Sequence, residues 1–147
     1  MTERSCYPGG CHCGNLRYVF STSQASRDWS VRRCTCSYCL RLAARYTSGA
    51  DTSLEVAVQD STTLARYEFA TRTAEFFRCG KCGVMIFAGC ELADRRFAVL
   101  NVNTLDNSSE LDLNVVDMDF DGEQVGDRLA RRRRNWIPDV SIRFVDS

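Results

Sequence analysis

The chain has 147 residues, of which 44% are hydrophobic, and its formal net charge is zero. This length suits a single domain over residues 1–147, and the balanced charge argues against a protein devoted to nucleic acid or membrane surfaces, because both uses need a strong positive field. No apolar run can span a bilayer and the first residues lack the apolar core of a signal peptide, so we expect a cytosolic protein.

Short alternating apolar segments separated by Gly, Ser, Asp and Asn predict a mainly β domain. The expected strands are Asn15–Ser21, Leu54–Val58, Leu64–Ala70, Glu75–Cys79, Val84–Gly89 and Arg96–Val102. Short helices are expected over Tyr38–Ala44 and Asp127–Asn135, the second ending before Pro138. We expect the strand phenylalanines in the core: Phe76, Phe77, Phe87 and Phe97.

The chain contains nine cysteines, an odd and high number for a cytosolic protein. Disulfides alone cannot pair an odd number of thiols, and a reducing compartment disfavours them. Metal ligation is therefore the better interpretation of the cysteines that lie close together in the sequence.

Two cysteine pairs can form one four-thiolate site. Cys11 and Cys13 form a C-x-C motif, which in an extended segment presents both sulfurs on one side and His12 on the other. Cys79 and Cys82 form a C-x2-C motif followed by glycine, which is typical of a zinc knuckle. Together they predict a closed structural zinc that ties the N-terminal strand to a later hairpin and contributes to folding. The alternative is that these four are unpaired core thiols.

A separate triplet, Cys34-x-Cys36-x2-Cys39, offers three ligands and leaves one position open, as in catalytic zinc sites. A zinc ion with three thiolates carries about −1 charge in total, so it should be a weak Lewis acid that prefers a thiol as its fourth ligand. We therefore predict that a substrate thiol binds there and is activated as the thiolate. Nearby arginines could offset the negative charge or bind a substrate carboxylate: Arg32, Arg33, Arg41 and Arg45.

Two alternatives for the triplet stay open. It could be a second structural zinc site completed by Cys90, Cys6 or His12, or a metal-free, redox-sensitive cluster. Otherwise Cys6 is expected at the surface and Cys90 in the core. His12, the only histidine, is expected to support the local backbone rather than act as a base.

Two C-terminal motifs are weaker. The segment Asp117–Gly122 matches the front of a calcium loop, but Arg128 stands where the bidentate Glu is needed, so we interpret it as an acidic strand end and turn. The basic run Arg131–Arg134 fits a solvated helix, or one paired with the acidic residues upstream, better than a nucleic-acid surface.

The ordered motifs "GGCHCGNLRY", "CTCSYCLR" and "EFFRCGKCGVMIF" resemble the glutathione-dependent formaldehyde-activating enzyme family, which includes the zinc domain of centromere protein V. The resemblance covers about residues 8–105, and residues 107–147 diverge. It implies a small, mainly β fold built around zinc, with one structural and one catalytic ion per chain. It implies that the four-cysteine set is structural and that glutathione binds at the zinc of Cys34, Cys36 and Cys39.

The function implied is that of a carbon–sulfur lyase, in which the thiol of glutathione adds to a small carbonyl compound such as formaldehyde. The alternative hypothesis is a non-catalytic, zinc-stabilised module that binds a macromolecule through its basic tail. We expect no membrane partner. The sequence leaves the carbonyl substrate and the oligomeric state open, with a homodimer among the options.

Overall fold

The computed structural model describes residues 3–146, which form eleven strands, two α-helices and four 3-10 helices. The strands are β1 (Ser5–Gly10), β2 (Leu16–Thr22), β3 (Ser30–Cys34), β4 (Tyr46–Ser48), β5 (Ser53–Val58), β6 (Leu64–Tyr67), β7 (Glu75–Cys79), β8 (Met85–Leu92), β9 (Arg95–Asn101), β10 (Val115–Met118) and β11 (Asp139–Phe144). The helices are α1 (Ser37–Leu42) and α2 (Val125–Asn135), with the 3-10 helices at Ser26–Asp28, Ser61–Thr63, Val102–Thr104 and Ser108–Glu110. The predicted mainly β class is confirmed.

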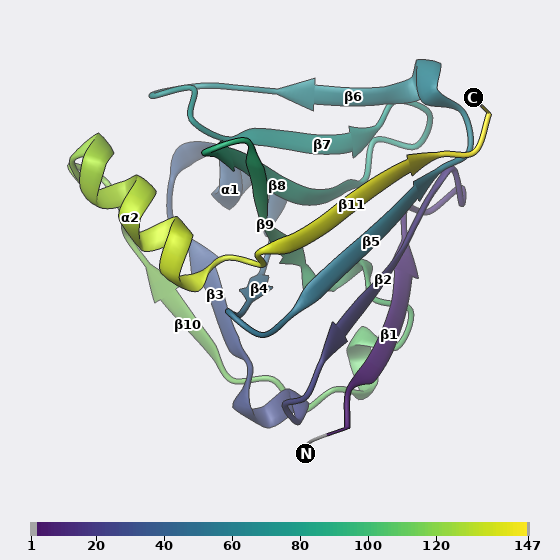
Figure 1. The fold of residues 1–147 in the computed structure, drawn as a ribbon, viewed down its shortest axis with the longest axis horizontal. Coiled ribbons are helices and arrows are strands. Elements are labelled where there is room, and N and C mark those ends of the chain that lie inside the picture. The colour runs from purple at the N-terminus through teal and green to yellow at the C-terminus, as the bar shows by residue number, and fades with distance from the viewer. Residues whose placement is uncertain (1–2, 147) are drawn as a thin grey trace.

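The strands form two sheets (Figure 1). The smaller has the order β1-β2-β5-β11, and the larger has the order β10-β3-β4-β9-β8-β7-β6. Neighbouring strands are antiparallel except for the pairs β5–β11 and β3–β10, which are parallel. In Figure 1 the larger sheet curves from β6 and β7 at the top, past β9 and β4, to β10 at the lower left, and α2 lies at its left edge.

The central strands of the larger sheet are buried on both faces, and β9 shows how the sequence achieves this. Its Ala98 and Leu100 pack in the main core between the two sheets. Its Phe97 and Val99 point the opposite way, into a second core. Because side chains alternate along a strand, one continuous apolar segment serves both cores.

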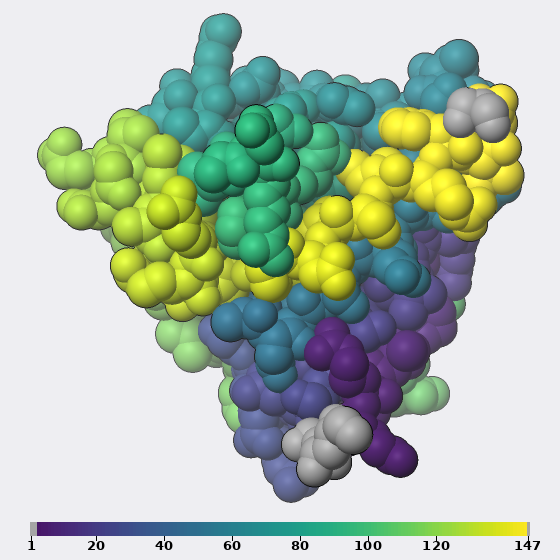
Figure 2. All heavy atoms as spheres, in the orientation of Figure 1, coloured from purple at the N-terminus to yellow at the C-terminus, as the bar shows by residue number. Residues whose placement is uncertain are grey.

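The second core lies where the two helices cover the larger sheet. Cys39 from α1 and Trp136, which directly follows α2, are buried there with β8 and β9 side chains. The chain after α2 is fixed by two hydrogen bonds between the backbones of Ile137 and Ala98, with N–O distances of 2.8 and 3.1 Å. From there it continues as β11 across the face shown in Figure 2.

All six predicted strands are present; β7 has the predicted ends, and the ends of the other five differ by at most three residues. The largest differences are in β6, which ends at Tyr67 rather than Ala70, and β8, which continues to Leu92 rather than Gly89. β6 is shorter because the chain turns after it: Ala70 and Arg72 have positive φ angles of 56° and 55°, outside the β region.

The sequence interpretation missed β1, β3, β4 and β11. β1 contains Pro8 and two glycines, which are typical of turns, but it is an edge strand of the smaller sheet, where proline is tolerated. β4 has only three residues and β3 carries two arginines, so neither shows a clear apolar alternation. The acidic segment follows the prediction, because β10 ends at Met118 and a turn follows.

Both predicted helices are confirmed, as Ser37–Leu42 and Val125–Asn135. α1 ends two residues earlier than expected, because Ala43 adopts a left-handed conformation with φ of 53° and stops the helix. No helix within residues 3–146 has the length and apolar character needed to cross a membrane.

Candidate metal centre and adjoining cavity

The two cysteine pairs meet as predicted. Sulfur atoms of Cys11, Cys13, Cys79 and Cys82 all lie within 4.8 Å of one another. The Cys11–Cys13 and Cys13–Cys79 sulfurs are 3.8 and 3.6 Å apart. A tetrahedral zinc with Zn–S bonds of about 2.3 Å requires sulfurs about 3.8 Å apart. This donor set therefore fits a four-coordinate metal ion.

The expected local structure of the first pair is wrong. Cys11 and Cys13 lie in the turn between β1 and β2, not on a strand. The chain must reverse there because β1 and β2 are paired up to Gly10, so the turn itself brings the two sulfurs together. The backbone N–H of Leu16 points back at the Cys11 sulfur at 3.2 Å. His12 lies exposed in this turn.

The second pair forms the expected knuckle between β7 and β8. The backbone N–H groups of Lys81 and Cys82 point at the Cys79 sulfur, at N–S distances of 3.3 and 3.4 Å. Gly83 has a φ of +82°, which residues with a Cβ rarely adopt. Burial raises the pKa of Cys79, but hydrogen bonds from these two N–H groups and from Cys13 together leave the pKa below its ordinary value. The turn is thus built to hold a thiolate.

The cysteine triplet lies where β3 passes into α1. Cys34 ends β3, Cys36 is the N-cap of α1, and Cys39 is in the first turn of that helix. The three sulfurs lie within 4.8 Å of one another. The Cys36 sulfur also accepts a hydrogen bond from the Cys39 backbone N–H at 3.4 Å, so it caps the helix while it faces the other sulfurs.

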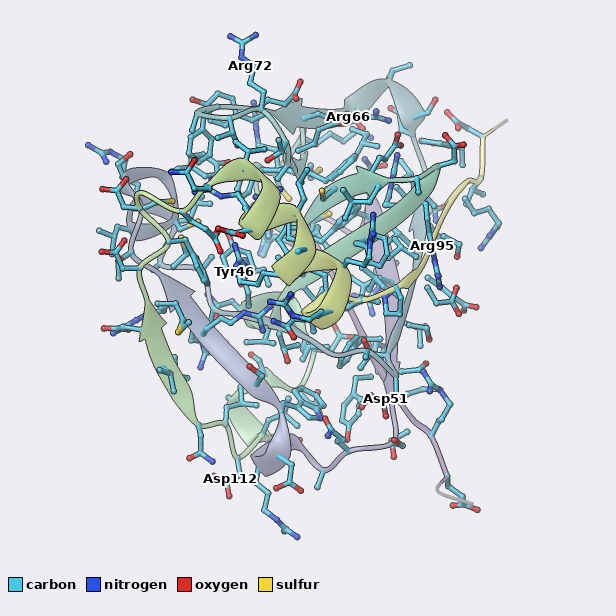
Figure 3. The ribbon with its side chains drawn as sticks, turned by 60° about the vertical axis from the view of Figure 1, so that its left-hand side comes forward. Tyr46, Asp51, Arg66, Arg72, Arg95 and Asp112 are labelled. Atoms are coloured by element: carbon cyan, nitrogen blue, oxygen red, sulfur yellow. The ribbon has the colours of Figure 1, made fainter. Side chains whose placement is uncertain are left out.

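The electrostatics of the triplet are unequal. A hydrogen bond from Cys39 is the main reason that the pKa of Cys34 falls to about 6, and the charge of Arg131 lowers it further. The same hydrogen bond and burial raise the pKa of Cys39. Cys39 is buried, and the Tyr46 hydroxyl lies 3.4 Å from its sulfur. Tyr46, which is labelled in Figure 3, belongs to β4, so it contacts Cys39 from the side of the larger sheet.

All three cysteines of the triplet line a cavity of about 760 Å³. The cavity lies between α1, α2, the loop after β6 and the turn after β10. Its walls are partly aromatic, with Tyr46, Phe69, Phe76, Phe120 and Trp136. Its size is within the range typical of small-molecule sites. An open coordination position at the triplet would therefore face a space that admits a substrate.

The alternative fourth ligands do not reach the triplet. Within residues 3–146, no further His, Cys, Asp or Glu ligand atom lies within 4.8 Å of all three sulfurs. Cys90 is buried and its sulfur accepts a hydrogen bond from Arg132 at 3.6 Å. Cys6 is exposed on the smaller sheet beside Ser21, which matches its expected surface position. The arrangement favours three protein ligands and an open place.

Only one of the four arginines expected near the triplet lines the cavity. Arg32 does so, whereas Arg33 is paired with Asp117 at 2.8 Å outside it. Arg41 donates to the Ser37 carbonyl and Arg45 to the Asn103 side chain. The spacing of residues along the sequence does not show on which side of β3 or α1 each guanidinium lies.

Three further cavity arginines come from α2, and the sequence interpretation missed them. Arg128, Arg131 and Arg132 line the cavity, while Arg133 and Arg134 are exposed. The expectation of a wholly solvated helix is therefore wrong for this face. The pairing with upstream acidic residues is confirmed, because Glu123 lies 3.3 Å from Arg128 and 3.0 Å from Arg131. These three arginines are spaced i, i+3 and i+4, which places them on one face of a helix, and this spacing is the feature of the sequence that could have identified them.

The core expectations hold for three of the four phenylalanines. Phe77, Phe87 and Phe97 are buried, with Phe77 and Phe87 stacked at 4.4 Å in the main core. Phe76 is only half-buried and lies at the cavity, in contact with Phe69 and Tyr38. Aromatic side chains thus extend from the second core to the mouth of the site.

Comparisons with known proteins agree with this geometry. A family model described as glutathione-dependent formaldehyde-activating enzyme matches residues 6–117. The match contains all seven clustered cysteines and ends just before the turn that leads into α2. A crystal structure of a Rhodobacter sphaeroides protein, a structural genomics target, has the same fold, with a TM-score of 0.51 and 24% identity over 74% of this chain and 99% of the other.

Proposed function

Because the chain belongs to the glutathione-dependent formaldehyde-activating enzyme family, we propose that it is a zinc-dependent carbon–sulfur lyase that joins a thiol, glutathione, to a small carbonyl compound such as formaldehyde. The observation that carries the proposal is the position of the triplet. Cys34, Cys36 and Cys39 lie on the wall of a substrate-sized cavity, with no fourth ligand within reach among residues 3–146.

We assign the two metal sites different roles. Cys11, Cys13, Cys79 and Cys82 form a complete four-sulfur set, which suits a structural zinc. The triplet would hold the second zinc, which lowers the pKa of a thiol in its open position. Thiolate-rich sites need reduced cysteines, which fits our proposal of a cytosolic location.

The chain's own residues then prepare the reaction. The thiol releases its proton to solvent water in the open cavity, and its sulfur attacks the carbonyl carbon. A carbon–sulfur bond forms, the π electron pair of the carbonyl moves to oxygen, and that oxygen takes a proton from water. The product is an S-hydroxyalkyl thiol, and no oxidant is needed. Tyr46 and the N-terminus of α1 hold Cys39 and Cys36 in place during this step.

The test is the rate of S-hydroxymethylglutathione formation with the zinc-loaded protein. NMR exchange spectroscopy with ¹³C-formaldehyde separates the enzymatic rate from the spontaneous one. We expect Cys36→Ser to abolish the acceleration while leaving the circular dichroism spectrum unchanged, since serine is a good N-cap for α1.

Cys6→Ser is the matched control, because Cys6 is exposed on the smaller sheet, away from both clusters. It should keep the full rate. A zinc-loaded wild-type protein that does not exceed the spontaneous rate with any small aldehyde would overturn the enzymatic proposal.

A further inference from the structure

The arginines of the cavity beside the triplet are not all paired with its acidic residues. Four arginines line it, and Glu123 is the acidic partner of two of them. The other lining carboxylates, Asp119 and Asp121, are exposed at the turn after β10. A bound carboxylate could pair with this charge directly, whereas formaldehyde carries no charge of its own.

Arg32 is the clearest case. It extends from β3 into the cavity wall and donates to the Ser48 hydroxyl at 2.7 Å and to the Ser30 carbonyl at 3.2 Å. Among the ion pairs of residues 3–146 none involves Arg32. Its partners are neutral, so the desolvation of its guanidinium is not offset by a protein carboxylate.

Arg131 approaches the same place from α2. Its Nε and Nη2 donate to the two carboxylate oxygens of Glu123, both at 3.0 Å, and its guanidinium lies 3.8 Å from the centre of the Phe120 ring. These contacts fix the side chain in one position. Arg131 and Arg32 thus line the same cavity, from α2 and from β3.

We propose that Arg32 and Arg131 form a carboxylate subsite beside the cysteine triplet, so that the reaction there takes an acidic substrate. Two fixed guanidinium groups of like charge are stable together when an anion lies between them. The carboxylate belongs to the thiol or to the carbonyl compound, as in an aldehyde acid. This inference rests on the proposed function, and it goes beyond the family match, since Arg131 lies outside residues 6–117.

Binding tests the subsite without any thiol chemistry. S-methylglutathione keeps both carboxylates but has no free thiol, and its diethyl ester lacks the carboxylates. By calorimetry with zinc-loaded protein, we expect the ester to bind about 10- to 100-fold more weakly, the usual value of a charged hydrogen bond. Arg32→Gln and Arg131→Gln should each weaken the binding of S-methylglutathione to a similar degree and leave the binding of its ester unchanged.

Arg133→Gln is the matched control, because Arg133 is on the same helix but exposed. Arg32→Lys should restore part of the affinity. If the Arg133 variant loses as much affinity as the other two, the subsite is refuted and the arginines merely balance the charge of the triplet. If the acid and the ester bind equally, the carboxylate does not come from the thiol.

The carbonyl partner is tested separately, by comparing glyoxylate with formaldehyde in the NMR exchange assay. If the carboxylate belongs to the thiol, we expect the ester of S-methylglutathione to bind weakly and both aldehydes to react at the same rate. If the carboxylate belongs to the aldehyde, we expect glyoxylate to react faster than formaldehyde, and we expect this advantage to be lost in Arg32→Gln and Arg131→Gln. The subsite is refuted if neither dependence is found. Carboxylate-dependent binding without any accelerated adduct formation would refute the proposed function and leave the subsite standing.

Discussion

The two cysteine clusters use the same ligand chemistry in different surroundings. The four-cysteine cluster takes its sulfurs from two turns of different sheets, and each turn directs backbone N–H groups at sulfur. The triplet takes all its sulfurs from one short segment at the start of α1 and faces a cavity. A cluster that joins distant segments is suited to stabilising the fold, whereas a local cluster on a cavity wall is accessible to a substrate.

The largest expected effect is on stability, when one cysteine ligand is removed from each cluster in turn. Cys79→Ser removes a fully buried ligand from the four-cysteine cluster and should cost several kcal/mol, a large part of the 5–15 kcal/mol that stabilises a typical domain. Cys36→Ser should change stability by about 1 kcal/mol or less, because serine keeps the helix cap. Urea unfolding of the two zinc-loaded variants measures both values. Equal losses would mean that both clusters are structural.

Metal removal sharpens the same contrast. We expect about two zinc ions per chain by elemental analysis, one for each cluster. Dialysis against a chelator should remove the ion of the triplet first, because three ligands and an open position hold it less firmly than four. The partly depleted protein should keep its β-sheet circular dichroism. Loss of both ions together, with unfolding, would contradict the assignment.

A smaller effect is expected from the buried side of the triplet. Tyr46→Phe removes the hydroxyl that lies 3.4 Å from the Cys39 sulfur and leaves the ring in the second core. Partners of metal ligands typically contribute 10- to 100-fold in affinity, so zinc should bind the triplet about 10-fold more weakly. Competition with a zinc indicator measures this, with the exposed Tyr67→Phe as control. An unchanged affinity would show that Tyr46 only fills space.

The smallest effect concerns the ion pair that positions α2. The hydrogen bond from Arg131, with the charges of Arg131 and Arg128, holds the pKa of Glu123 below its ordinary value of 4.5. A carboxyl with a lowered folded-state pKa contributes stability above the unfolded value, and this is lost as pH falls through the folded value. Glu123→Gln should therefore cost about 1 kcal/mol or less at pH 7.

The pH dependence provides the check on that ion pair. The difference between Glu123→Gln and wild type should shrink as the pH falls below about 4.5, the ordinary pKa of Glu123. Thermal unfolding across this range measures it, and Glu110→Gln, at an exposed position, should show no such trend. A difference that is constant with pH would mean that the ion pair contributes no electrostatic stability.

Local chemistry explains which parts of the fold were predictable. The alternating strands and both helices follow from patterns within a few residues, so their presence was evident from the sequence. β1 was not predictable in this way, because Pro8 and its glycines form a strand only when β2 offers a partner. β11 likewise depends on β5, with which it pairs in parallel across a long stretch of intervening chain.

The sequence by itself determined which cysteines lie close together within each motif, because their spacing fits one turn. That the two pairs share one site was decided by the tertiary structure. The Cys79–Cys82 knuckle, with the glycine that follows it, is specified by adjacent residues alone. Only the tertiary structure decided what surrounds the triplet. Arg32 and Arg131 are far apart in the chain, and they line one cavity because the packing of Trp136 in the second core fixes the rotation of α2. The direction of a side chain on a helix becomes known only when its packed face is known.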